Sequence, residues 1–168
     1  MAGLVHELIE ILDEQKECYE GLLTLAQYKT DSIVNREMEF LEDVLKREQE
    51  FIGRAARLEK NREDILKDIS NVLNLNLKEL TISNIILKLD KTPVEQEKLR
   101  QLRKDLLGIV EEIKQHNMTN EGLINQSLEF IDFTLHAIQS INSYPSSGYQ
   151  NEGDDIKQPN KSFFDAKQ

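Results

Sequence analysis

Glu112 and His116 form the residue pair in this sequence that comes closest to a site for chemistry. They are four residues apart, so a helix would place a carboxylate and an imidazole, both metal ligands, on one face. A di-metal carboxylate bundle, however, needs Glu-x-x-His pairs from two helices and further carboxylates that face inward. Because only one weak half of that set is present, a solvated pair is the favoured interpretation.

Nucleophilic and phosphate-binding chemistry also lack the residues that they need. Cys18 is the single cysteine, and Lys16 would lie on another face of a helix, where it cannot activate the thiol. The glycines are scattered singly, so there is no Gly-rich loop for a phosphate group. The acidic runs alternate with apolar residues and do not form a Gly-centred calcium loop. The sequence therefore predicts no catalytic, cofactor-binding or metal-binding residue, and a protein that is not an enzyme.

The net charge and the apolar content limit the classes of partner that we expect for this chain. The 168 residues carry a formal net charge of −10, which opposes binding to a phosphate backbone, so we do not expect nucleic acid as a partner. The N-terminus lacks a basic segment and an apolar signal segment, and no apolar run approaches the roughly 20 residues of a membrane span. One cysteine fits a reducing compartment. We therefore predict a cytoplasmic protein without membrane insertion.

Apolar residues recur at steps of three and four along three segments, which predicts helices. The first helix is expected over residues 4–28 and ends at the polar, cap-forming stretch 29–32. The second is expected over residues 38–73. The connector 74–92 has room for one short helix, and a long last helix is expected over residues 93–142. These elements predict an all-α fold, an elongated antiparallel bundle of long, coiled-coil-like helices.

The last predicted helix combines great length with an irregular apolar stripe. Thr92 to Glu95 has the pattern of a capping box, and about 1.5 Å per residue gives the helix a length of about 70 Å. Between Ile113 and Leu123, polar residues stand at or beside the positions where apolar ones are expected. This polar band is either a layer that fixes the register of the bundle or a place where another chain docks.

The composition changes after residue 142, where apolar residues become too few to form a packed core. We therefore predict a helical domain over residues 1–142 and a flexible tail over residues 143–168. Within the tail, Phe163 and Phe164 form an apolar pair, which is either a docking element or part of an inert end.

Several stretches together resemble a known family. They are the run 117–131 (NMTNEGLINQSLEFI), followed by Tyr144 and Gly148, and the shorter runs 57–62 (RLEKNR), 73–75 (LNL) and 164–167 (FDAK). In this pattern and in its order of helices, the chain resembles the FlgN-type flagellar export chaperones over nearly its whole length.

That resemblance implies a small acidic chaperone that binds hook–filament junction proteins of the FlgK and FlgL type. It would hold their amphipathic C-terminal segments and deliver them to the flagellar export gate. Carried onto this sequence, client contact falls on the last helix, and the tail supports it or competes for the same groove through Tyr144, Phe163 and Phe164. The client-binding residues implied are Ile113, Asn117, Asn120, Ile124, Leu128, Ile131 and Leu135.

An alternative function is a self-associating coiled-coil scaffold, in which a second copy, as in a homodimer, covers the apolar stripe. Strict heptads with apolar residues throughout would favour the scaffold. The interruption from Asn117 to Asn120 disfavours it.

Overall fold

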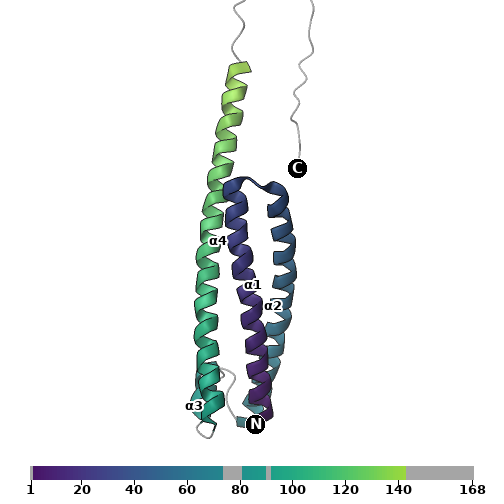
Figure 1. Ribbon diagram of the computed structural model, residues 1–168, viewed down its shortest axis with the longest axis vertical. Coiled ribbons are helices and arrows are strands. Elements are labelled where there is room, and N and C mark those ends of the chain that lie inside the picture. The colour runs from purple at the N-terminus through teal and green to yellow at the C-terminus, as the bar shows by residue number, and fades with distance from the viewer. Residues whose placement is uncertain (1, 74–80, 90–91, 143–168) are drawn as a thin grey trace, which may run out of the picture. The chain divides into compact units, whose positions relative to one another are not determined.

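The computed structural model describes residues 2–73, 81–89 and 92–142, and helices occupy nearly all of them (Figure 1). The helices are α1 (Ala2–Asn35), α2 (Met38–Leu73), α3 (Ile82–Lys88) and α4 (Pro93–Asn142). No strand occurs within the described ranges. The predicted all-α bundle of long helices is therefore confirmed.

The chain divides into two units, Met1–Phe130 and Ile131–Gln168. The first unit holds α1, α2, α3 and the larger part of α4, and the packing described below belongs to it. The described part of the second unit is the remainder of α4. The predicted tail, residues 143–168, lies outside the described residues, so the boundary after residue 142 stays a prediction.

The end of α1 differs from the sequence-based expectation, because the helix continues through the cap-forming stretch to Asn35. The hydroxyl group of Ser32 donates to the carbonyl of Tyr28, four residues earlier. The single hydroxyl proton of Thr30 is shared between the carbonyl of Ala26, four residues earlier, and Oδ1 of Asn120 on α4, so neither hydroxyl needs to cap the end of the helix. Arg36 then adopts a left-handed conformation with φ 60°, and the N–H of Glu37 donates to the carbonyl of Ser32. This is the hydrogen-bond pattern of a Schellman motif, which ends the helix.

The helices α3 and α4 begin in different ways, one with a capping side chain and the other with a proline. Thr81 caps α3, since its side chain accepts a hydrogen bond from the N–H of Asn84 at 3.2 Å. The helix α4 starts at Pro93, whose fixed φ suits the first helical position. The hydroxyl of Thr92 is buried without a hydrogen-bond partner among the described residues, so the predicted capping-box bond to this hydroxyl is not formed.

The hydrophobic core lies where all four helices meet. It combines one face of α1 with the last turns of α2, the buried side of α3 and the first turns of α4. Its members are Val5, Leu8, Ile9, Leu12, Leu66, Ile69, Ile85, Ile86, Leu89, Leu99 and Leu102. Among the described helices, none has a stretch apolar enough and long enough to cross a bilayer.

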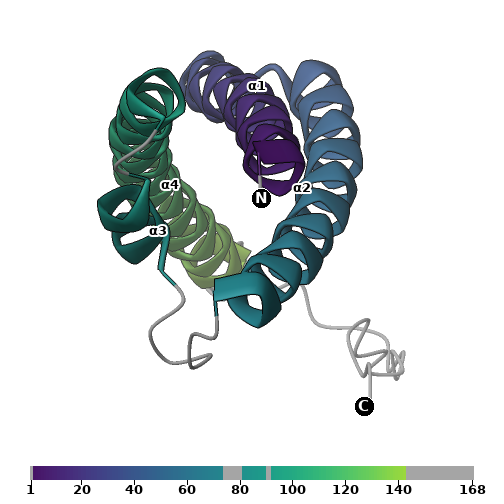
Figure 2. The ribbon, with the colours of Figure 1, turned by 90° about the horizontal axis from the view of Figure 1, so that it is seen from below.

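In both ribbon views α1 lies between α2 and the first part of α4 (Figures 1 and 2). The two-residue turn at Arg36 and Glu37 makes α2 antiparallel to α1, whereas α4 runs parallel to α1. At Gly21 the two helices of the hairpin are so close that a methyl group built there would overlap the ring of Phe51. Farther along the chain from the core, α4 is held to α1 by polar contacts.

Candidate interaction surface

Exposed apolar side chains continue along α4 from its second quarter to its end. Single exposed apolar residues are ordinary on protein surfaces, but a long run of them marks a surface that another chain covers. The large apolar residues of this part that are exposed are Leu107, Val110, Met118, Ile124, Leu128, Phe130, Ile131, Phe133, Leu135, Ile138 and Ile141.

Four of these residues share one face of the helix. Ile124, Leu128, Ile131 and Leu135 follow one another at steps of four, three and four, the spacing of a single helical stripe. We call these four residues the exposed stripe. Between 42% and 54% of each side chain is exposed. Ile124 and Leu128 belong to the first unit, and Ile131 and Leu135 to the second.

The register of α1 against α4 explains why the stripe is uncovered at Ile124 and Leu128. Three hydrogen bonds join the two helices: Lys16 Nζ to Asp105 Oδ2, Thr30 Oγ1 to Asn120 Oδ1, and Asn120 Nδ2 to the carbonyl of Ala26. The paired residues are 89 to 94 positions apart in the sequence. With these offsets of 89 to 94 residues, Asn35, the last residue of α1, lies level with residues 124–129 of α4, so α1 ends at the level of Ile124 and Leu128 and leaves both partly exposed.

Asn120 joins α4 to the last turns of α1, and it is buried, with 2% of its surface exposed. Its amide nitrogen donates to the carbonyl of Ala26 at 3.0 Å, and its amide oxygen accepts from the Thr30 hydroxyl at 2.6 Å. A buried amide needs such partners. At this position the polar band is therefore a polar contact of the bundle, and Asn120 faces α1 and is not exposed with the stripe.

The other residues of the band and of the predicted site lie in different surroundings. Asn117 is exposed, and Ile113 is half-buried. The expectation that both contact a client stays a prediction, as it does for the exposed stripe. Tyr144, Phe163 and Phe164 lie outside the described residues.

In the described part of the chain, the residues that could bind a metal or act in catalysis do not come together in one site. Glu112 is exposed, His116 is half-buried, and no group of three or more His, Cys, Asp or Glu residues there has the arrangement of a metal site. Cys18 is buried, and its thiol donates a weak hydrogen bond to the carbonyl of Phe51 at 3.4 Å. Burial raises the pKa of the Cys18 thiol, which opposes formation of a nucleophilic thiolate.

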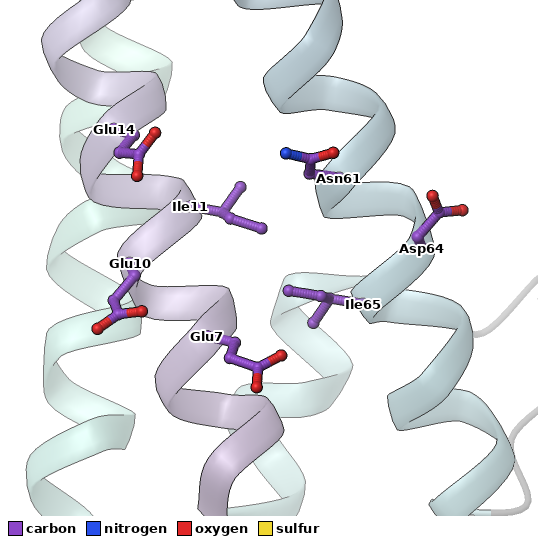
Figure 3. A pocket seen from close by; sticks show the side chains of 7 residues that line it. All are labelled: Glu7, Glu10, Ile11, Glu14, Asn61, Asp64 and Ile65. Carbon is purple, nitrogen blue, oxygen red and sulfur yellow. The ribbon is translucent and has the colours of Figure 1, made fainter.

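A hollow of about 390 Å³ opens between α1 and α2. The sequence does not predict it, because it depends on which residues of α1 lie opposite which residues of α2. Ile11 and Ile65 point toward the space between the helices, and carboxylate groups surround them (Figure 3). Two of these carboxylates have partners, since Lys67 binds Asp64 at 3.2 Å and His6 lies 3.2 Å from Glu10. The residues that line the hollow are Glu7, Glu10, Ile11, Glu14, Asn61, Asp64 and Ile65.

Comparison with known proteins gives two matches. The profile of the family described as "FlgN protein" matches residues 1–155. The uncharacterized protein YvyG of Bacillus subtilis (strain 168) is 30% identical over 127 residues, which are 76% of this chain and 76% of YvyG. No solved structure matches the chain. The resemblance found in the sequence is confirmed, and the chain belongs to the FlgN family of flagellar export chaperones.

Proposed function

We propose that this protein is a cytoplasmic, non-enzymatic chaperone that binds hook–filament junction proteins of the FlgK and FlgL type before their export. The client segment is an amphipathic helix that lies on the exposed stripe of α4. Binding covers the apolar face with which the client would otherwise associate too early, and the complex delivers the client to the flagellar export gate.

The observation that carries this proposal is the half-exposed apolar stripe of α4, whose first residues, Ile124 and Leu128, lie at the level where α1 ends. An amphipathic helix is the natural occupant, because its apolar residues at steps of three and four match the spacing of the stripe. Each half-exposed stripe residue that becomes buried contributes roughly 1 kcal/mol. Four such residues on one side do not outweigh the cost of association, so the client must contribute an apolar face of similar size.

Two further features are consistent with a chaperone that binds its client reversibly. Such binding needs no nucleotide, since both partners gain from burying apolar surface and the complex can dissociate at the gate. The tail offers a second apolar group, Phe163 and Phe164, and Tyr144 precedes them in the sequence. These residues either add to the client contact or compete with the client for the stripe.

Titration calorimetry with a purified hook–filament junction protein from the same organism tests the proposal. The wild-type chain should bind one to one with a negative heat-capacity change, the mark of apolar burial. Ile124→Asp and Leu128→Asp should each weaken binding by at least about tenfold, because a charge at the centre of the contact would be buried. Phe133→Asp is the matched control, since Phe133 is exposed on the face of α4 opposite Ile131 and Leu135 and its variant should bind like wild type.

Circular dichroism separates a lost contact from a lost fold. The proposal requires that both stripe variants keep the helical signal and melting temperature of the wild type. If they unfold, Ile124 and Leu128 are core residues and the contact is misplaced. If the wild type does not bind the junction protein and light scattering reports a stable dimer, the stripe serves self-association, and the scaffold function replaces this one.

A further inference from the structure

The charges of α4 change abruptly along its length. Lys114 is the last Lys or Arg of the helix, because neither occurs from residue 115 to residue 142, where the other basic side chains are His116 and His136. The same stretch contains Glu121, Glu129 and Asp132. None of these three carboxylates forms an ion pair within the described part of the chain, whereas Asp105, earlier in α4, is paired with Lys16 at 2.7 Å.

The three carboxylates lie on one side of the exposed stripe. A helix turns by about 100° per residue, which places Glu121 about 20°, Asp132 about 40° and Glu129 about 100° beyond Leu128, all on the side away from Ile124. Glu121 and Asp132 therefore border the stripe, and Glu129 lies farther round the helix. The opposite flank carries uncharged residues such as Leu123 and Ser127. The stripe therefore has an acidic edge on one side and a neutral edge on the other.

We propose that the helix that occupies the exposed stripe carries Lys or Arg residues on the one flank that meets Glu121, Glu129 and Asp132. This inference rests on the proposed function and adds the chemistry of the partner. Opposite charges at the rim of an apolar contact select the partner and its orientation and speed association, while adding modestly to affinity. A partner with acidic residues on that flank would face three uncompensated carboxylates and would be rejected.

Two synthetic amphipathic peptides of 18 residues test the inference against the full-length chain. Both carry leucines at the spacing of the stripe, and they differ only in having three lysines or three glutamates on one flank. The lysine peptide should bind about five- to tenfold more tightly in dilute buffer, the effect of a few rim ion pairs. The difference should shrink as salt is added, because exposed charges are screened.

A charge-removed variant and its control locate the effect. Glu121→Gln, Glu129→Gln and Asp132→Asn, combined in one chain, should bind both peptides nearly equally. The control removes the same three charges from exposed positions of α2, as Glu50→Gln, Glu63→Gln and Asp68→Asn, and should keep the preference for lysine. Equal binding of the two peptides to the wild type, or a preference that the α4 variant retains, would overturn the inference.

Failure of this inference and failure of the proposed function have different signatures. If the wild type binds both peptides equally while Ile124→Asp still loses the junction protein, the basic flank is wrong and the chaperone function stands. If Ile124→Asp binds the junction protein as the wild type does, the stripe is not the client site and both fail. A stable dimer that excludes both peptides would identify a second copy of this chain as the occupant, and would overturn the inference.

Discussion

Gly21 shows at the scale of one residue why the helix propensity of a sequence is a weak guide to stability. Glycine inside a helix costs up to about 1 kcal/mol relative to alanine, so Gly21 looks unfavourable in the sequence. The structure explains it, because the ring of Phe51 on α2 occupies the space that a side chain at residue 21 would need. The glycine permits the close approach of α1 and α2 at this level.

Gly21→Ala should therefore lower the free energy of unfolding by about 1 to 3 kcal/mol, because the ring of Phe51 has to move inside a packed contact. Gly108→Ala is the matched control, since a methyl group on Gly108 meets no atom within 4 Å. That control should stabilise the chain by up to about 1 kcal/mol. Urea unfolding of both variants measures the difference. A gain in stability from Gly21→Ala would show that α1 and α2 are farther apart than described.

At the scale of elements, the α1–α2 hairpin depends on polar contacts as well as on the apolar core. Glu59 on α2 accepts hydrogen bonds from Gln15 of α1 at 3.0 Å and from Arg62, one turn further along α2. The bond from Arg62, with that from Gln15, holds the pKa of the Glu59 carboxyl below its ordinary value of 4.5. Glu59 therefore joins the two helices best in its charged form.

The lowered pKa predicts a pH dependence with a definite sign. The Glu59 carboxylate stabilises the fold above pH 4.5, and this contribution is lost as the pH falls through the lowered pKa. Glu59→Gln should reduce the free energy of unfolding at pH 7 by about 0.5 kcal/mol, since the pair is partly exposed. The variant should then lose less stability than the wild type on acidification.

Urea unfolding at several pH values between neutral and about pH 3, where carboxyl groups titrate, measures how steeply the free energy of unfolding falls with pH in the wild type and in Glu59→Gln. We call this dependence the pH slope of each chain. Gln15→Leu removes the donor from α1 and keeps Arg62, so its pH slope should lie between those of the wild type and Glu59→Gln. Identical pH slopes for all three chains would contradict the assigned role of Glu59.

The elements also show what the sequence could predict. The period of apolar residues places α2 and α4 correctly, because long, regular stripes leave little choice of structure. The end of α1 was predicted too early, because Thr30 and Ser32 are cap formers that can also bond backward inside a helix. The role of Asn120 stayed open between two interpretations, since it depends on which α1 residues lie beside it. Register of this kind is a property of the folded bundle.

At the scale of the whole molecule, the core lies within the described helices and draws on each of them. Removing residues 143–168 should therefore leave the melting temperature nearly unchanged, as the sequence predicts for a tail without enough apolar residues to form a core. Thermal unfolding followed by circular dichroism measures this. A large drop would show that the tail packs on the bundle.

The same truncated chain distinguishes the two roles proposed for the tail. If Tyr144, Phe163 and Phe164 add to client contact, truncation weakens binding of the junction protein. If they compete for the exposed stripe, truncation strengthens it. Alanine at Phe163 and Phe164 in the full-length chain should reproduce the direction of the change.

The lengths of α1 and α4 have a consequence for how binding surfaces can differ among related chains. The two helices run side by side from a common core, but α1 has 34 residues and α4 has 50. The Schellman turn at Arg36 thus sets the point at which α1 stops covering one face of α4. A chain with the same α4 and a first helix longer by two turns would cover Ile124 and Leu128, so evolution can resize this surface without changing any residue in it.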